Sequence, residues 1–428
     1  MKTVFKLLLL PVVLISIASF AQQESWSDEW EEVWEEDQAT TVWSGFLEAG
    51  IGTRFSSDPL LAEGNTLEEV RARLESEWQP DRYKISLKAD IAYDGVENDW
   101  LADLRDLSIG FTLGDSTDVA IGRQIQTWGT GDLVFLNDLF PKDFQSFFSG
   151  RDDEYLKAPG NAIRLTRYSS SVNVDFVWTP AFEPDNYLTG ERYSFFSPQV
   201  GRNVAPRFKA LEPAQTFSNG EFAARLFGTI EGREFALYGY RGFFKQPNAL
   251  TASLQATFAP MTAIGASLRQ PLGPGLFNAE VSWYDSRDDK AGSNPLIPND
   301  QLRLLAGYEW EAKRNFTVGV QYYLEWTLDH DQLMAKSPFR QFEPEERRQL
   351  LTNRLTWRAG MDKYTWALFS FYSPSDRDYY LRPQFTYRHN DQWSLTTGGN
   401  LFGGDQAKTF FNQLQDASNA YLRLRYSY

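Results

Sequence analysis

The chain has 428 residues, no cysteine, only two histidines and a formal net charge of −15. The lack of cysteine excludes disulfides and thiolate metal centres, and the acidic balance argues against a nucleic-acid-binding protein. Aromatic residues make up 15% of the chain although its mean hydropathy is −0.45. This combination is typical of transmembrane β-barrels, in which only alternate residues meet lipid.

Residues 1–21 have the layout of a secretory signal peptide. Lys2 and Lys6 precede an apolar run over residues 7–17, and a small-residue site ends at Ala21. The run is shorter than the roughly 20 apolar residues that a membrane-spanning helix needs. We therefore expect cleavage after Ala21, and a retained membrane anchor is the alternative.

Residues 22–41 form an acidic segment that contains three tryptophans. Trp26, Trp30 and Trp34 are spaced by four residues, which places them on one face of a short helix. We expect the segment to lie in the periplasm, where it either docks a partner or folds into the barrel mouth. A solvated acidic tail is the alternative, because runs of charge are usually solvated.

Alternation of apolar and polar residues over 42–428 predicts about eighteen strands. In 315–327, for example, Phe316, Val318 and Val320 alternate with polar or small residues. The predicted strands of the first half are residues 42–56, 66–79, 82–95, 104–114, 118–128, 161–168, 172–180, 220–230 and 233–244. Those of the second half are residues 261–270, 276–286, 300–311, 315–327, 350–360, 364–373, 379–389, 392–402 and 419–428.

The lengths of the connections support this count. Short turns follow the even-numbered strands, and mostly long connections, up to 129–160 and 181–219, follow the odd-numbered ones. A nineteenth strand over 250–258 would place the long segment 287–299 in the periplasm, so we assign 250–258 to an external loop. The sequence predicts an all-β protein with a single transmembrane antiparallel barrel over 42–428, short periplasmic turns and long external loops. An array of soluble β-sandwiches is the alternative, but it does not require this sorting of connections.

The last predicted strand ends on a row of apolar and aromatic residues. Leu424, Tyr426 and Tyr428 share one face, as in the C-terminal strand by which the barrel-assembly machinery recognises its substrates. We therefore expect a location in the outer membrane of a Gram-negative bacterium. The expected partners are this machinery, outer-membrane lipid and lipopolysaccharide.

Strand parity places many arginines on the inner face of the barrel. The predicted pore-lining basic residues are Arg54, Arg71, Arg73, Arg354, Arg358, Arg382, Arg388, Arg423 and Arg425. Only four acids, Glu48, Glu69, Glu75 and Glu77, fall in the same sector. One interpretation is an anion-attracting wall, because arginine stays charged and its forked donors suit carboxylate or phosphate. The other is a set of Arg–Glu ladders that stiffen the wall, with Glu309, Glu311 and Glu325 as further partners.

The connection over 129–160 is the main candidate for a constriction. Aromatic residues are followed there by a run of mixed charge. The candidate constriction residues are Phe144, Phe147, Phe148, Arg151, Asp152, Asp153 and Glu154. The sequence leaves open whether this loop folds into the lumen or packs as an external cap.

One short motif resembles a known family. Gly122-Arg123-Gln124, followed by Trp128-Gly129, is similar to a segment of alginate-export-type porins and related uncharacterised barrel families. The resemblance implies export of an anionic polysaccharide through a basic pore. Strict alternation points Arg123 toward lipid, and a β-bulge near Gly122 would turn it inward.

The most favoured function is passive passage of solutes through a porin or export channel, with anions as one option. One alternative is a non-conducting partner barrel that receives lipid or hydrophobic cargo from an inner-membrane exporter. A barrel hydrolase is the other, but His330 is the sole external histidine and no Gly-x-Ser-x-Gly motif accompanies it. We expect no enzymatic activity, no cofactor and no metal site, since neither a nucleotide fingerprint nor calcium-loop spacing occurs.

Overall fold

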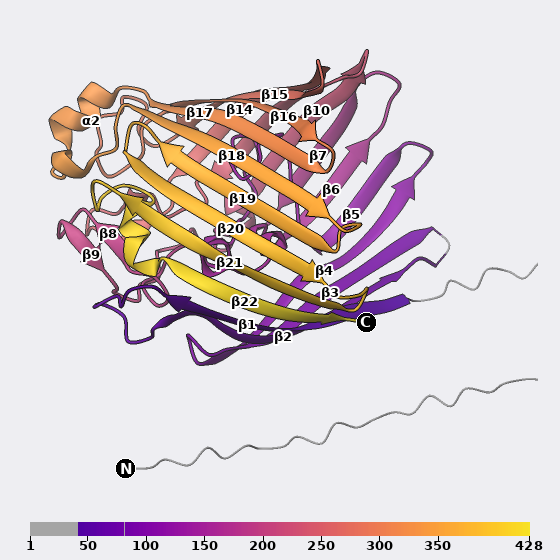
Figure 1. Ribbon diagram of the computed structural model, residues 1–428. Coiled ribbons are helices and arrows are strands. Elements are labelled where there is room, and N and C mark those ends of the chain that lie inside the picture. The colour runs from indigo at the N-terminus through magenta and orange to yellow at the C-terminus, as the bar shows by residue number, and fades with distance from the viewer. Residues whose placement is uncertain (1–41, 81) are drawn as a thin grey trace, which may run out of the picture. The chain divides into compact units, whose positions relative to one another are not determined.

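The barrel is closed and has eighteen strands. The computed structural model describes residues 42–80 and 82–428; the predicted signal peptide and the segment with Trp26, Trp30 and Trp34 lie outside the described residues. All eighteen strands belong to one antiparallel sheet, which closes because β1 (Val42–Arg54) pairs with β22 (Asn419–Ser427). Figure 1 shows the tilted strands, with short turns at one end and long loops carrying the β8–β9 hairpin and α2 at the other.

Each predicted strand corresponds to one strand of the barrel, so the predicted fold class is confirmed. After β1, the first half contains β2 (Asn65–Trp78), β3 (Tyr83–Asp94), β4 (Asp99–Leu113), β5 (Thr117–Gln124), β6 (Gly160–Arg167), β7 (Asn173–Thr179), β10 (Glu221–Ile230) and β11 (Arg233–Phe243). Before β22, the second half contains β14 (Pro260–Leu272), β15 (Gly275–Ser286), β16 (Gln301–Lys313), β17 (Phe316–Thr327), β18 (Arg347–Ala359), β19 (Tyr364–Ser373), β20 (Asp378–Arg388) and β21 (Trp393–Gly404).

The long loops carry small elements of their own. Two two-stranded hairpins lie outside the barrel sheet, and four 3-10 turns accompany two short helices. The hairpins are β8 (Phe195–Ser197) with β9 (Arg202–Val204) and β12 (Ala249–Leu250) with β13 (Ala256–Thr257), and the helices are α1 (Phe144–Ser149) and α2 (His330–Lys336). The 3-10 turns are η1 (Asp153–Leu156), η2 (Phe217–Asn219), η3 (Arg340–Phe342) and η4 (Asn412–Ala417). Residues 250–258 are therefore loop, as the connection lengths predict. No helix among residues 42–80 and 82–428 is long and apolar enough to cross a membrane.

Strand β4 begins five residues earlier than predicted because a bulge disrupts its alternation. The pairing with β3 shifts between Lys88 and Ala89, which leaves Arg105 as the extra residue of β4. Trp100 before the bulge and Leu107 after it are both exposed although an odd number of positions separates them. The alternation of inward and outward side chains along β4 is therefore broken at Arg105. For this reason the sequence pattern detects only the part of the strand that follows Arg105.

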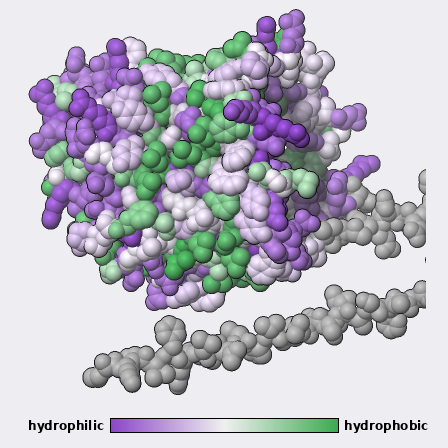
Figure 2. Space-filling model, viewed as in Figure 1, coloured by the Kyte–Doolittle hydropathy of each residue, from purple (hydrophilic) through white to green (hydrophobic). Residues whose placement is uncertain are grey.

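The outer face of the barrel is apolar and the inner face is polar. In β1, Trp43, Leu47 and Ile51 are between 51% and 55% exposed, whereas Glu48 and Arg54 are buried. Figure 2 shows hydrophobic residues gathered over the strands, between hydrophilic ends. Stacked aromatic rings, such as Trp357 on Trp366 at 4.8 Å, lie near the short-turn end. An apolar band with aromatic rings at its border is the outer surface of a membrane barrel, so the protein is an outer-membrane β-barrel.

Candidate constriction site

The loop over residues 125–159, between β5 and β6, lies in the lumen. Its helix α1 is capped at the N-terminus by Asp143, whose carboxylate accepts from the Ser146 amide at 2.7 Å, and at the C-terminus by Gly150 with φ +94°. A Cβ at position 150 would lie 2.3 Å from the Tyr421 ring, so the helix end fits closely against β22. The predicted constriction loop is therefore inside the barrel and does not cap it.

The predicted aromatic residues pack α1 against the wall. Phe147 and Phe148 are 5% and 2% exposed. Both rings meet Tyr380 of β20 edge-on at 5.7 Å, and Phe148 also meets Phe402 of β21 at 5.5 Å. Phe144 is only partly buried and packs at the edge of this cluster. The helix is thus fixed to one side of the lumen by aromatic contacts.

The acidic run after α1 pairs with the predicted lumen arginines. Asp152 lies 3.4 Å from both Arg423 and Arg425 of β22. Asp153 accepts from Arg382 of β20 at 2.7 Å. Burial raises the pKa of Asp152, but the guanidinium groups of Arg423 and Arg425 outweigh that effect, and its pKa lies below the ordinary value. Asp152 is therefore held as a carboxylate.

Glu154 and Tyr155 extend this contact to β2 and β3. Arg73 donates to Glu154 at 2.5 Å, to Asp90 at 2.6 Å and to the Tyr155 hydroxyl at 2.7 Å. Tyr155 in turn donates to Asp90 at 2.6 Å. Arg71 completes the group by donating to Asp90 at 2.9 Å. Asp90 is the shared acceptor of the group and is 1% exposed.

Arg151 joins the loop to two further acids of the same wall. It donates to Glu69 of β2 at 2.9 Å and to Asp94 of β3 at 2.9 Å. Arg192, from the loop over residues 180–220, also pairs with Asp94. We call residues 151–155 with their partners on β2, β3, β20 and β22 the charged anchor.

Six of the nine predicted arginines make ion pairs: Arg71, Arg73, Arg354, Arg382, Arg423 and Arg425. Arg54 instead donates to the main-chain carbonyls of Glu63, Asn65 and Arg192. Arg358 and Arg388 lie exposed near the short-turn ends of their strands.

The acids predicted to accompany these arginines fall into two groups: some pair with a predicted arginine, and the others have a different partner. Glu48 pairs with Arg423 and Arg425, and Glu75 with Arg73. Glu77 pairs with Lys84 instead, and Glu325 with Arg303. Glu311 accepts from the Asn315 amide at 2.6 Å, and Glu309 lines a cavity described below. Of the predicted acids, Glu48, Glu69 and Glu75 thus pair with the predicted arginines, whereas Glu311 and Glu325 have other partners.

The start of the loop contacts the opposite wall through main-chain groups. Glu280 of β15 accepts from the amides of Thr130 and Gly131, the latter at 2.8 Å, and from the Asn137 side chain at 2.7 Å. Gln321 of β17 accepts from the Asp132 amide at 2.7 Å and donates to the Asp132 carbonyl at 2.8 Å. We call residues 130–134 the latch.

One ion pair ties the latch to β18. Arg354 donates to both carboxylate oxygens of Asp132, at 2.5 and 2.8 Å, and the two side chains are 30% and 41% exposed. The next residue, Leu133, has φ +58°, a strained backbone region for a side chain of its size.

The sequence prediction missed Asp132, Glu280 and Gln321. Each is a single polar residue in an alternating or loop segment, so no local pattern distinguishes it.

The latch separates two cavities. On the external side, a cavity of about 290 Å³ is lined by Leu133 and Val134 together with charged wall residues such as Arg303 and Arg348. On the periplasmic side, a cavity of about 80 Å³ is lined by Thr130, Asp132, Glu309, Gln321 and Arg354, among others.

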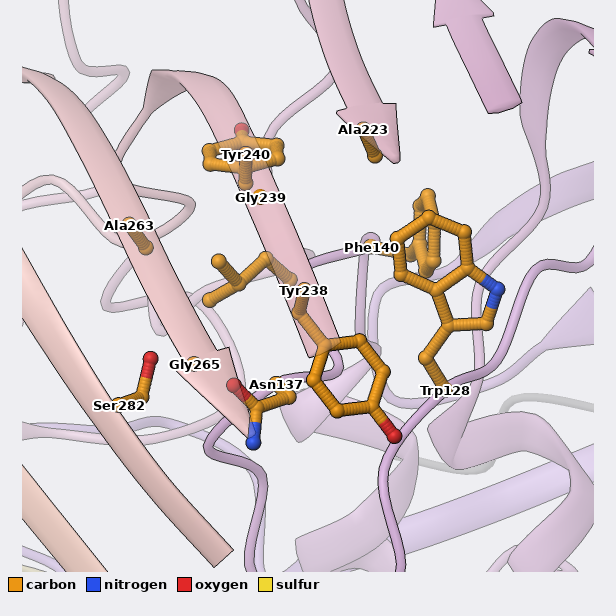
Figure 3. A pocket seen from close by; sticks show the side chains of 11 residues that line it. Trp128, Asn137, Phe140, Ala223, Tyr238, Gly239, Tyr240, Ala263, Gly265 and Ser282 are labelled. Atoms are coloured by element: carbon orange, nitrogen blue, oxygen red, sulfur yellow. The ribbon is translucent and has the colours of Figure 1, made fainter. Parts of the chain in front are cut away.

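A third contact region lies between the loop and strands β10–β15. Trp128 packs on Phe140 at 5.0 Å and on Tyr238 at 6.0 Å, and its indole donates to Asp175 at 3.2 Å. Figure 3 shows Trp128, Tyr238 and Asn137 around a small pocket. Its volume is only about 10 Å³, which is room for at most one water molecule, so the loop packs closely on this wall at that point.

The residues that suggested a family resemblance have local roles. The pairing of β4 with β5 is unshifted at Gly122 and Arg123, and Arg123 lies opposite the exposed Leu107. Gly122 has φ +133°, and a Cβ there would lie 2.2 Å from the Leu107 carbonyl oxygen. Arg123 donates to Leu104 O at 2.7 Å and pairs with Glu183 at 3.0 Å, while Gln124 donates to Ala162 O at 3.2 Å. The bulge lies in β4, and the pairing of β5 with β4 is regular. Through its ion pair with Glu183, Arg123 holds the external loop over residues 180–220.

The two histidines lie far from this loop. His330, at the start of α2, contacts the Pro344 carbonyl oxygen at 3.0 Å, and His389 contacts the Tyr387 hydroxyl at 3.2 Å. Among residues 42–80 and 82–428, no group of histidine and acidic side chains is arranged to hold a metal ion.

No family model matches the chain, and no curated protein matches it. The resemblance to alginate-export-type porins is therefore not shown. Three solved structures share its architecture over almost their whole length. OccK9 (OpdG) of Pseudomonas aeruginosa is 12% identical, with a TM-score of 0.55 over 91% of this chain and 97% of that one. OccAB3 of Acinetobacter baumannii is 9% identical, with a TM-score of 0.54 over 91% and 99%. OccK5 (OpdH) of Pseudomonas aeruginosa is 11% identical, with a TM-score of 0.53 over 91% and 97%. At these identities the likeness concerns the fold alone: the chain is an eighteen-stranded outer-membrane barrel similar in fold to the Occ proteins.

Proposed function

We propose that the protein is a channel for the passive passage of small solutes across the outer membrane, constricted by the loop over 125–159. The observation that carries the proposal is the latch, whose residues line both an external and a periplasmic cavity. A barrel of eighteen strands is wide enough for an aqueous path unless loops fill it. Its fold similarity to Occ outer-membrane channels supports the same function.

The arginines of this lumen serve mainly to hold the loop. Asp152, Asp153 and Glu154 neutralise the arginines nearest to them, so little net positive field remains at the charged anchor. The cavity on the periplasmic side is balanced as well, because Arg269 and Arg354 face Asp132 and Glu309. We therefore propose a channel with weak ion selectivity. A strong anion preference in reversal potentials across planar bilayers would contradict this part of the proposal.

Single-channel conductance tests the main proposal. The wild-type channel is compared with Glu280→Gln, which weakens the hydrogen bonds that hold the latch, and with Glu311→Gln as the control. Glu311 is an exposed acid at the short-turn end of β16, away from the latch. We expect a small conductance for the wild type, a larger or more frequently open one for Glu280→Gln, and no change for Glu311→Gln. If all three folded barrels block ions completely, the proposal is wrong.

A further inference from the structure

A large cavity lies at the external mouth of the barrel. We call it the vestibule; its volume is about 870 Å³. Nine aromatic residues line it, among them Phe148, Tyr187, Phe195, Phe196, Phe342 and Phe410. Its volume falls in the range of about 300–1,000 Å³ that is typical of sites for small organic molecules.

The vestibule is built from loops alone. Its lining comes from α1, the β8–β9 and β12–β13 hairpins, η3, η4 and the connections between them, and no barrel strand contributes. Phe196 meets Phe342 of another loop at 5.1 Å, and Phe195 meets Phe208 within its own loop at 5.4 Å. Because no lipid-facing strand residue lines the cavity, its occupant comes from the external water rather than from the bilayer.

The lining contains little charge. Lys209 is 80% exposed at its side chain and pairs with Glu212 at 3.2 Å, so its ammonium group points to water. Glu343 accepts a hydrogen bond from Ser337, and burial raises the pKa of its carboxyl. The remaining polar groups are uncharged, such as Gln246, Gln255 and Gln413. An anionic ligand would lose its hydration here and find only the water-facing Lys209 as an ionic partner.

The vestibule leads toward the channel interior. It shares Phe144, Phe148, Gln246, Asn248 and Phe410 with the 290 Å³ cavity above the latch. Aromatic rings line both cavities, but the inner one adds the charged side chains of Lys142, Arg303, Glu325 and Arg348. A molecule from outside therefore meets the less charged of the two cavities first.

We propose that the vestibule is a binding site for an uncharged, mainly apolar small molecule that carries an aromatic ring. Rings in the lining offer edge-to-face contacts to an aromatic ligand, and the glutamine amides accept or donate to one or two polar atoms. The site exists whether or not the ligand then crosses the membrane.

Calorimetric titration of the full barrel in lipid nanodiscs tests the site, with empty nanodiscs subtracted. The probes are 2-naphthalenemethanol, which is uncharged, and 2-naphthoate, which has the same ring system and a carboxylate. We expect saturable binding of the alcohol at one site and binding of the carboxylate weakened about tenfold or more.

The test variant is F196S/F342S, which removes two rings from the lining. The matched control is F217S, because Phe217 is 77% exposed at the β10 end of the loop that carries Phe196 and does not line the vestibule. We expect the double variant to weaken binding of the alcohol about tenfold or more and the control to leave it unchanged.

No saturable binding, equal binding of both probes, or an equal loss in F217S would overturn the proposal. Saturable binding of a fatty acid in place of the alcohol would also overturn it, in favour of a lipid site. Conductance measured on the same variants distinguishes failure of the binding site from failure of the channel function. Because F196S/F342S leaves the latch intact, we expect it to lose binding of the alcohol but to keep the wild-type conductance.

Discussion

The two ends of the lumen loop are held by different physical means. The charged anchor joins residues 151–155 to the wall through two buried contacts: Arg151 pairs with Glu69 and Asp94, and Tyr155 donates to Asp90. The side chains of Asp152, Asp153 and Glu154 are 34–43% exposed, but the arginines Arg423, Arg382 and Arg73 that they contact are at most 8% exposed. The latch holds residues 130–134 through main-chain hydrogen bonds and one ion pair that is 30% and 41% exposed.

This difference separates a permanent attachment from a releasable one. A buried cluster cannot lose one partner cheaply, because the charge left behind has no water to solvate it. A half-exposed pair exchanges its bonds for water at little cost. We therefore expect the loop to stay fixed at the charged anchor and to move at the latch, and the following predictions test this contrast.

The largest effect is expected for Asp90→Ala in the charged anchor. Asp90 is the common acceptor of Arg71, Arg73 and Tyr155, so its removal leaves two buried guanidinium groups short of a partner. The free energy of unfolding should fall by about 3–5 kcal/mol, as measured by urea denaturation of the detergent-solubilised barrel. Asp99→Ala is the control, since Asp99 is exposed and accepts only from the neighbouring Trp100 amide. A loss below about 1 kcal/mol for Asp90→Ala would show that the anchor is not a buried charge cluster.

A smaller effect is expected for Glu280→Ala beneath the latch. The substitution removes the acceptor of the Thr130 and Gly131 amides and of the Asn137 side chain. We expect a loss of about 1–3 kcal/mol in the free energy of unfolding, because the amides regain water when the latch lifts. Conductance should rise at the same time. Unchanged conductance combined with this loss of stability would mean that the latch does not control the path.

The barrel could be predicted from the sequence, but the attachment of the loop could not. Alternation is local, so it identified all eighteen strands and the inward parity of residues such as Arg423. It failed where a bulge at Arg105 shifted the phase of β4. The partner of Arg423 in the loop is Asp152, 271 positions away, and nothing local to either residue indicates the pairing. Glu280 and Gln321 were missed for the same reason, since their partners are main-chain amides that every loop residue offers.

The stability of the protein is expected to depend on pH through Asp185, which lies where external loops meet between the charged anchor and the latch. Burial raises the pKa of Asp185 to about 6, although the nearby Lys142 and Lys245 lower it in part. The native state therefore binds a proton between pH 4 and 6 that the unfolded chain has already lost, and stability falls as pH rises through this range. Going from pH 7 to pH 5 should stabilise the protein by about 1 kcal/mol, measured as the change in urea midpoint. Asp185→Asn should abolish the part of this difference that comes from Asp185. If the variant keeps the full pH dependence, another group causes it.

The smallest change in stability is expected for Asp132→Asn, which breaks the ion pair with Arg354. Because both side chains remain partly in water, the free energy of unfolding should change by less than about 1 kcal/mol. The hydrogen bonds of the Asp132 main chain to Gln321 persist, so the latch is loosened and not destroyed. Its opening should nevertheless become more frequent in single-channel recordings, and 1 M salt should reproduce this in the wild type by screening the pair. Arg354→Gln is the matched variant, and the double variant should behave like either single one. A loss of stability as large as that of Asp90→Ala would mean that both ends of the loop are equally permanent, and the solute would then need a different path.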